Sequence, residues 1–258
     1  MKIGVVSHPD RSEVVEVEAN LRAAAAANGV SVVDVADADV VVSIGGDGTL
    51  LRAVRAAGPT RPVVGIDVGY VGYLADVEPE ATAGLVASLA AGDYAVVDRM
   101  TVAVELPDGT VFTGLNDVVV EKVMSQHALR LQCRIDGEPL ATYRADGLIF
   151  ATPTGSTAYA YSAGGPVVDL SVEALLLVPV AAHNLFSRPL VMQPDSLIEI
   201  EVLAGRPARI NVDGQDLGIA ESGDLLRIRR GDKPALLITL DSVGFAARLS
   251  TNLGIPPQ

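Results

Sequence analysis

The sequence has 258 residues, 49% of them hydrophobic, which is enough to bury the core of one large domain or two ordinary domains. Its formal net charge is −13, and only three of its 19 basic residues are lysines, so nothing in it could coat a nucleic-acid backbone. A single cysteine excludes an internal disulfide framework, and no uncharged apolar run is long enough to span a membrane, so we expect no membrane partner.

Composition also sets expectations about the compartment and the source. The N-terminus lacks the basic and apolar regions of a signal peptide, which favours a cytoplasmic, unprocessed protein. The three histidines, His8, His127 and His183, lie far apart without metal-ligand spacing, so we expect no metal site built by the protein. Acidic excess, arginine in place of lysine and the lack of tryptophan resemble proteins of salt-loving organisms, whose surface carboxylates keep them soluble.

The first part of the chain alternates between apolar strands and helices. Asp10 and Glu13 have the spacing of a capping box at the start of the first helix, and Gly29 ends that helix. The expected strands lie at 2–7, 30–35, 40–44 and 62–67, and the expected helices run from about 10 or 12 to 27, from about 49 to 57 and from 78 to 91. This order is typical of an α/β domain with a parallel sheet.

The segment 43–51, Ser-Ile-Gly-Gly-Asp-Gly-Thr-Leu-Leu, joins an expected strand to a helix through a glycine-rich turn. Its glycines let the backbone take positive φ and expose N–H groups, and a helix that begins near Thr49 adds its positive end, so the turn attracts phosphate. Asp47 would repel a bare phosphate there, so we expect it to face a hydroxyl or a metal ion, as in phosphoryl transfer to an alcohol. Tight surface turns without chemistry can have the same pattern. Arg52, on the helix that follows, could reach a phosphate or be a solvated helix residue.

A second glycine-rich turn, 65–73, follows the strand expected at 62–67. The carboxyl ends of parallel strands meet at one edge of a sheet, and ligands bind at that edge in open α/β sheets. We therefore expect both turns to face one crevice.

From residue 96 onward, short alternating apolar segments predict a β-rich domain. Asp-Gly pairs between these segments predict hairpin turns at 107–109, 136–139 and 213–214. Cys133 lies among leucines, so we expect it in the core. We divide the chain into an α/β domain at 1–95, a β-rich domain at 96–234, and a final segment at 235–258 whose apolar strand could return to the first domain.

The segment 145–159 places an acidic residue before an apolar strand and a loop rich in small hydroxyl side chains directly after it. Short polar side chains and exposed backbone groups suit ribose and amide edges, and Tyr159 or Tyr161 offers a flat face for a base. The polar pair Asn116-Asp117 precedes another strand in a similar way. Each of these segments, taken alone, is also compatible with an ordinary turn.

Taken together, four motifs resemble the NAD kinase family: Gly-Gly-Asp-Gly-Thr at 45–49, Asn-Asp at 116–117, Asp-Gly at 146–147 with Thr-Pro-Thr-Gly-Ser-Thr-Ala-Tyr at 152–159, and Val-Asp-Gly-Gln at 212–215. The eight-residue run is highly specific, whereas diacylglycerol and sphingosine kinases and phosphofructokinases share the glycine turn. The resemblance implies an α/β domain and a β-rich domain with NAD held in the crevice between them. It further implies that ATP, with Mg²⁺, phosphorylates the adenosine-ribose 2′-hydroxyl to give NADP, and that the subunits form a homodimer or homotetramer.

The resemblance also assigns roles to the matched residues. Asp47 is expected to accept the proton of the 2′-hydroxyl. The other positions expected to bind NAD or ATP are Gly45, Gly46, Gly48, Thr49, Arg52, Asn116, Asp117, His127, Arg144, Asp146, Ser156, Thr157, Ala158, Tyr159, Ser162 and Gln215. No metal ligand is expected among the side chains.

Two segments depart from the family pattern. Asp67-Val68 stands where Asn or His followed by a polar residue is commoner, and 182–186 stands where a Pro-His-Ser/Thr-Leu segment is usual. Two other functions are compatible with the sequence: a lipid or other small-alcohol kinase with the same glycine turn, and a nucleotide-binding regulator without catalysis. The loop at 152–159 suits a nucleotide better than an acyl chain.

Overall fold

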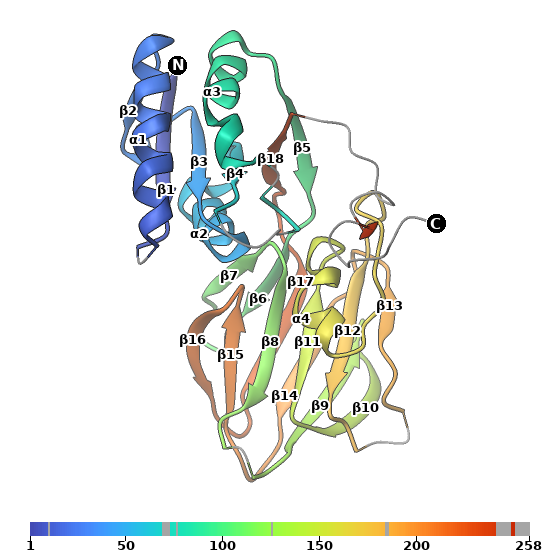
Figure 1. Ribbon diagram of the computed structural model, residues 1–258. Helices are drawn as coiled ribbons and strands as arrows, with labels where there is room; N and C mark the ends of the chain where they lie inside the picture. The colour runs from blue at the N-terminus through green and yellow to red at the C-terminus, as the bar shows by residue number, and fades with distance from the viewer. Residues whose placement is uncertain are drawn as a thin grey trace. The chain divides into compact units, whose positions relative to one another are not determined.

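The computed structural model describes residues 1–9, 11–68, 73–75, 77–124, 126–183, 186–240 and 249–250. These residues form two compact units (Figure 1). The first unit contains Met1–Arg99 and the chain from Ala235 onward, and the second contains Met100–Pro234. The first unit is α/β and the second is almost entirely β, which confirms the fold class predicted from the sequence.

The first unit is built on a six-stranded sheet. Its strands are β1 (Lys2–Ser7), β2 (Ser31–Val33), β3 (Val40–Ile44), β4 (Val63–Ile66), β5 (Ala95–Arg99) and β18 (Ala235–Thr239). The strand order is β2-β1-β3-β4-β18-β5, and the first four strands pair in parallel, as predicted. β18 is parallel to β4 and antiparallel to β5.

Three helices cover the faces of this sheet: α1 (Ser12–Ala27), α2 (Asp47–Ala57) and α3 (Thr82–Ala91). Single 3₁₀ turns lie at Val35–Asp37, Gly58–Thr60 and Pro79–Ala81. α1 and α3 share a core cluster with Val42 and Val64 of the sheet. Neighbouring strand residues face opposite sides, and Gly65, next to Val64, faces Leu50 of α2. α2 therefore packs on the opposite face of the sheet. Within the described part of the chain, no helix combines the length and apolar content that crossing a membrane would need.

Some element boundaries differ from those expected. The strand expected at 30–35 ends at Val33, and the helix expected from residue 78 begins at Thr82 after a 3₁₀ turn. α1 begins at Ser12 after Arg11, which makes no side-chain capping bond. Asp10, the expected capping residue, lies outside the described residues.

The division of the chain also needs one correction. The sequence boundary at 95 and 96 places nearly all of β5 in the β-rich domain. β5 instead pairs over all five of its residues with β18, so both strands belong to the sheet of the first unit. This pairing joins segments far apart in the sequence, and apolar alternation alone does not show which strand is the partner.

The second unit contains two six-stranded sheets in which all neighbouring strands are antiparallel. One sheet has the order β10-β9-β14-β17-β6-β7: its strands are β6 (Val102–Glu105), β7 (Val111–Gly114), β9 (Leu129–Ile135), β10 (Glu138–Ala145), β14 (Ile198–Val202) and β17 (Leu225–Arg230). The other has the order β13-β12-β11-β8-β15-β16: its strands are β8 (Asp117–Lys122), β11 (Gly147–Ala151), β12 (Leu175–Val180), β13 (Leu190–Met192), β15 (Ala208–Val212) and β16 (Gln215–Ala220).

The two sheets of the second unit enclose a large hydrophobic core. Val118 and Val120 of β8 point into this core, which also contains Cys133, as predicted. Burial raises the pKa of the Cys133 thiol to about 12. Val119, between the two inward valines, faces the other way and packs against Ala160 of the short helix α4 (Tyr159–Ser162). β8 is therefore covered on both faces, which explains its continuous apolar run.

Candidate functional site

The glycine turn of the first unit joins β3 to α2, as predicted. The N–H of Gly45 donates to the carbonyl of Ile66 at 3.0 Å, and the N–H of Val68 donates to the carbonyl of Gly45 at 3.3 Å. Gly45 has a φ of 151°, and a Cβ there would lie 2.4 Å from Oγ1 of Thr49. Both the conformation and the space at this position require glycine.

The other two glycines of the turn have a different role from the one expected. Gly46 has a φ of −89°, and Gly48 already lies in α2, which begins at Asp47 rather than near Thr49. Positive φ is therefore confined to Gly45. A Cβ at Gly46 or Gly48 would meet no atom within 4 Å, so packing does not require glycine at either position. Both glycines leave open space in front of the first turn of a helix, where N–H groups and the helix dipole favour an anion.

Asp47 is half-buried and bonded to a neighbouring backbone segment. Its Oδ2 accepts the N–H of Tyr73 at 2.9 Å, and its Oδ1 accepts the N–H groups of Leu74 at 3.0 Å and Ala75 at 3.4 Å. An ionised carboxylate offers about four acceptor positions, so these bonds leave about one for a further donor. The side chain thus holds the backbone at 73–75 and can still accept a hydroxyl proton.

Arg52 is not a solvated helix residue. It is half-buried, and its Nη2 lies 3.3 Å from Oγ1 of Thr49 and 3.5 Å from the carbonyl of Ser7. These contacts hold the guanidinium against the glycine turn and the end of β1. Thr49 itself is buried and packs against Gly45, so its hydroxyl supports the turn. In the second glycine turn, residues 69–72 lie outside the described part of the chain.

In the second unit, Asn116 and Asp117 are buried at the start of β8, with 8% and 6% of their surfaces exposed. The backbone N–H of Thr152 donates to the carbonyl of Asn116 at 2.9 Å, and the hydroxyl of Thr152 donates to the carbonyl of Leu115 at 2.6 Å. Among the described residues, no donor reaches Oδ1 of Asn116. A buried acceptor without a partner costs free energy, so this oxygen is suited to an N–H group of a ligand.

The carboxyl group of Asp117 has a raised pKa. Burial, and to a smaller degree the negative charge of Asp213, raises the pKa of Asp117 from 3.8 to about 7. Asp213 belongs to the Val-Asp-Gly-Gln motif at 212–215, but the sequence predicted no role for it. Desolvation and a like charge both penalise the ionised form, so Asp117 is about half-protonated near neutral pH.

The free energy of unfolding of Asp117→Asn should therefore rise relative to that of the parent protein as pH increases. The folded protein holds a proton on Asp117 between about pH 4 and pH 7 where the unfolded chain does not, so the parent loses stability as pH increases through this window. The asparagine variant has no proton to lose. We expect its advantage in free energy of unfolding to grow by about 1.4 kcal/mol per pH unit up to about pH 7 and then stay constant. Urea titrations from pH 5 to pH 8 measure this difference, and parallel curves for the two proteins would contradict the assignment.

The hydroxyl-rich loop after β11 lies against Asn116. Gly155, within the 3₁₀ turn Thr154–Thr157, is so close that a Cβ on it would lie 2.1 Å from the carbonyl oxygen of Asn116. Ser156 is fully buried: its hydroxyl donates to Pro153 at 2.6 Å and accepts the N–H of Val168 at 3.1 Å. The hydroxyl of Ser156 is therefore used to shape the loop, and the role of this residue in binding the nucleotide stays a prediction.

The residues after Ser156 are more accessible. Thr157 and Ala158 are half-buried, and the hydroxyl of Thr157 donates to the carbonyl of Thr154 at 3.4 Å. Tyr159 is 41% exposed, and Ser162 at the end of α4 is also exposed. The motif run therefore divides into a buried part that packs against Asn116 and an accessible part that begins α4.

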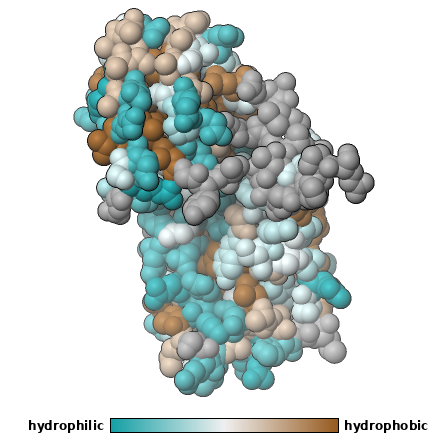
Figure 2. All heavy atoms as spheres, viewed as in Figure 1, coloured by the Kyte–Doolittle hydropathy of each residue, from teal (hydrophilic) through white to brown (hydrophobic). Residues whose placement is uncertain are grey.

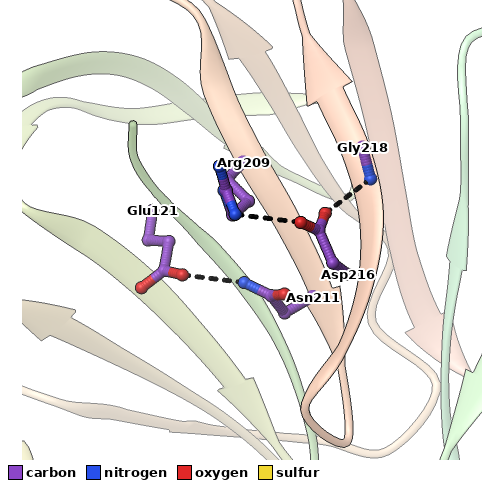
Figure 3. A network of polar contacts seen from close by, with 5 residues as sticks. All are labelled: Glu121, Arg209, Asn211, Asp216 and Gly218. Carbon is purple, nitrogen blue, oxygen red and sulfur yellow. Dashed lines mark hydrogen bonds and ion pairs between the residues drawn. The ribbon is translucent and has the colours of Figure 1, made fainter. Parts of the chain in front are cut away.

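Tyr159 lies among acidic side chains of the second unit. Partial burial raises the pKa of its phenol, and the nearby charges of Glu121, Asp117 and Asp146 raise it further. Asp146 forms an ion pair with Lys122 at 2.7 Å. Figure 3 shows that Nδ2 of Asn211 on β15 donates to Glu121 at 2.8 Å, which fixes the direction of that side chain. The structure thus brings Asp117, Asp146 and Tyr159 into one region.

Beside this group, Figure 3 shows a separate ion pair between Arg209 of β15 and Asp216 of β16, at 2.9 Å. The other oxygen of Asp216 accepts the N–H of Gly218 at 2.8 Å. These contacts stabilise the edge hairpin and involve none of the predicted ligand residues.

Three further predicted residues also belong to the second unit. His127 is exposed, and Gln215 is the exposed first residue of β16. Arg144 lines a cavity of about 240 Å³ together with Arg130 and Arg206, and none of the other predicted site residues is among its described lining residues. The roles of these three residues as ligand contacts stay predictions.

Comparison with known proteins identifies the family. Residues 6–94 match the family model of the ATP-NAD kinase N-terminal domain, and residues 115–240 match that of the ATP-NAD kinase C-terminal domain. The chain belongs to the NAD kinase family. An NAD kinase of Nocardia farcinica is 41% identical over 84% of this chain and 69% of its own length. An NAD kinase of Methanocorpusculum labreanum is 38% identical over 98% of this chain and 99% of its own.

Solved structures show that the fold is also that of NAD kinase family members. The crystal structure of an NAD kinase from Archaeoglobus fulgidus in complex with ATP superposes with a TM-score of 0.81, at 28% identity over 98% of both chains. The yeast NADH kinase complexed with NADH superposes with a TM-score of 0.91, at 22% identity over 100% of this chain and 89% of the yeast chain, which shows the shared fold. Within the described residues of this NAD kinase family member, no group of three or more acidic, histidine or cysteine side chains could hold a metal ion.

Proposed function

We propose that this chain is an NAD kinase that transfers the γ-phosphoryl group of ATP to the 2′-hydroxyl of the adenosine ribose of NAD, giving NADP. The proposal rests on three side chains of the second unit that are suited to bind a ligand. Oδ1 of buried Asn116 has no partner among the described residues, the carboxyl of Asp117 has a pKa raised to about 7, and the ring of Tyr159 is accessible. All three belong to motifs of the family whose domain model matches residues 115–240.

Each of these side chains suits one part of the adenosine half of NAD. Oδ1 of Asn116 can accept an N–H from the adenine amino group, which would satisfy the buried acceptor. Asp117, when ionised, can accept hydrogen bonds from ribose hydroxyls. Tyr159 offers an aromatic face on which a base can stack.

The glycine turn suits the donor phosphates. Gly46 and Gly48 leave open space before the first turn of α2, and a backbone without side chains can approach a phosphate closely. A divalent cation such as Mg²⁺, bound to the phosphates of ATP, would neutralise their charge. The described side chains form no metal-binding cluster of their own.

Asp47 is proposed to remove the proton of the ribose hydroxyl. The freed oxygen attacks the γ-phosphorus of ATP, a new oxygen–phosphorus bond forms, and the bond to the bridging oxygen breaks, so that ADP leaves. The proton is then on Asp47, whose bonds to Tyr73, Leu74 and Ala75 keep the carboxylate fixed while the hydroxyl approaches. Positioning of the hydroxyl and the phosphate supplies most of the catalysis.

The test is incubation of the purified protein with NAD, ATP and Mg²⁺, followed by chromatographic identification of the products. Formation of NADP and ADP in equal amounts supports the proposal. Phosphorylation of diacylglycerol or sphingosine instead would indicate a lipid kinase, and NAD binding without any product would indicate a regulator. Replacing ATP with polyphosphate, or NAD with NADH, defines the donor and the acceptor.

Further properties are part of the same proposal: composition suggests the compartment and the lack of nucleic-acid and membrane partners, and the family resemblance suggests the oligomeric state and the substrates. The enzyme is cytoplasmic, which agrees with a single cysteine that is buried in the core. The subunits form a homodimer or homotetramer, which sedimentation can measure. NAD and ATP are its substrates, and it has no nucleic-acid or membrane partner.

The composition further predicts that salt stabilises this enzyme. With 32 acidic and 19 basic residues, the folded chain repels itself at low ionic strength, and salt screens that repulsion. Hydrophilic side chains cover much of the face seen in Figure 2. We expect the melting temperature to rise with KCl from low to molar concentration, and a flat or falling curve would contradict a salt-adapted surface.

A further inference from the structure

Asp213, to which the sequence reasoning gave no role, makes an unusual set of contacts in the turn between β15 and β16. Its φ is 49° and that of Gly214 is 74°, as in a tight two-residue hairpin turn. The carboxylate of Asp213 accepts three successive backbone N–H groups from a segment almost one hundred positions earlier: Leu115 at 2.7 Å, Asn116 at 2.8 Å and Asp117 at 3.1 Å.

These contacts complete the bonding of the backbone from 115 to 117. On the carbonyl side, Thr152 bonds the first two residues, and the N–H of Asp213 donates to the carbonyl of Asp117 at 3.1 Å. Every N–H and carbonyl of these three residues therefore has a partner. The backbone has no freedom to rotate without breaking bonds, so the positions from which the Asn116 and Asp117 side chains leave the backbone are fixed.

The neighbouring glycine supports this arrangement. A Cβ on Gly114 would lie 2.9 Å from Oδ1 of Asp213 and 2.7 Å from Val212, so only glycine lets the carboxylate approach this closely. The contact therefore depends on two residues. Gly114, at the end of β7, leaves the space for the carboxylate, and Asp213 brings the carboxylate there from a left-handed turn position.

We infer that Asp213 is a positioning residue for NAD: its carboxylate holds the backbone of Asn116 and Asp117 in the geometry that binds the adenosine. This inference rests on the proposed function, because it concerns the same binding residues. Asp213 need not touch the nucleotide.

Two ionisable groups face Asp117, and of these only Asp213 carries a charge that raises the pKa of Asp117, because the raised pKa of Tyr159 leaves its phenol neutral. Asp213 lies in the β15–β16 turn, and Tyr159 lies on α4, while Ala151, opposite Asp117 on β11, has no ionisable group. Removing the charge of Asp213 should therefore make Asp117 easier to ionise. A residue that only shaped the hairpin would not change this ionisation.

The chain offers a matched control in Asp136. It occupies the same position in the turn between β9 and β10, with a φ of 52° followed by Gly137 at 83°, and its carboxylate accepts the N–H of Leu197 at 2.8 Å. Asp136 therefore has the same turn geometry and the same kind of backbone contact, but it holds none of the predicted ligand residues.

The experiment compares Asp213→Asn, Asp213→Ala, Asp136→Asn and Asp136→Ala with the parent enzyme, using NADP formation and calorimetric NAD binding from pH 5.5 to 8.5. Asp213→Ala should raise the KM for NAD about 10- to 100-fold and change kcat by less than about threefold, since binding groups rather than the reacting atoms lose their positions. Asp213→Asn keeps one acceptor oxygen, so its KM should rise less.

The pH dependence of NAD affinity gives a second readout. Its midpoint, expected near 7 in the parent, should move to lower pH in Asp213→Asn. The Asp136 variants should keep the parent KM and midpoint.

Two results would overturn the inference in distinguishable ways. If the parent forms NADP but the Asp213 variants match the Asp136 variants in KM and in pH midpoint, Asp213 only shapes a turn. If the parent neither binds NAD nor forms NADP, the proposed function fails and the inference fails with it.

Discussion

Asp47→Asn should lower the turnover number for NADP formation by about 10²- to 10⁴-fold, the usual effect of losing a general base. The asparagine side chain keeps the size of the aspartate but cannot take a proton from the ribose hydroxyl. Affinity for NAD should fall only modestly, because Asn116, Asp117 and Tyr159 remain. Steady-state kinetics and direct binding measurements on the same preparation separate the two effects.

The contacts of Asp47 also require a stability measurement on this variant. The amide group of asparagine would face the N–H of Tyr73, so one charge-assisted hydrogen bond is lost, at a cost of about 1.5–3 kcal/mol. Asp39→Asn is a matched control in the same unit, since Oδ2 of Asp39 accepts the N–H of Lys2 at 2.8 Å and no ligand role is proposed for it. The control should lose some stability and keep the parent turnover. If Asp47→Asn forms NADP at near the parent rate, Asp47 only holds the backbone at 73–75.

Gly155→Ala should lower the free energy of unfolding by about 3 kcal/mol or more. The new methyl carbon would lie 2.1 Å from the carbonyl oxygen of Asn116 and 2.5 Å from the carbonyl carbon, and backbone atoms cannot rotate away as a flexible side chain can. The loop and the start of β8 must therefore move apart. We expect a melting temperature lower by roughly 5–10 °C and a weakened affinity for NAD, because both displaced segments contain ligand residues.

Gly84→Ala provides the comparison for this substitution. Gly84 is exposed on α3, and a Cβ there would meet nothing within 4 Å, so alanine should raise stability by up to about 1 kcal/mol through its better helix propensity. If the free energy of unfolding falls in Gly155→Ala and rises in Gly84→Ala, the lack of space at Gly155, and not the loss of glycine flexibility, causes its destabilisation. Parent-like melting and NAD affinity in Gly155→Ala would contradict the close approach of loop and strand.

The elements that the sequence predicts well are those whose signals are local. The apolar run at 40–44, the glycine turn after it and the Asp-Gly turns at Asp136 and Asp213 each appear in the structure as expected. Apolar periodicity and turn chemistry are properties of a few neighbouring residues, so they can be read directly from the sequence.

The sequence is less informative where contacts between distant parts of the chain determine the position of a side chain or the partner of a strand. Asp213 lies 98 positions from Leu115, and no local pattern shows that its carboxylate bonds that segment. Ser156 belongs to a motif rich in hydroxyl groups, and only packing determines that its hydroxyl faces inward while Tyr159 remains accessible. The same limit applies to β5, whose antiparallel partner is the last strand of the described chain.

The position of β18 has a consequence for the order in which the protein is made. β18 lies between β4 and β5, although more than one hundred residues of the second unit separate it from them in the sequence. During synthesis, the edge of β4 therefore remains without its neighbour until the chain has passed Thr239, by which time the whole second unit has been translated. The first unit to emerge is thus the last to complete its sheet, and its open strand edge is a site where a nascent chain could pair wrongly or recruit a chaperone.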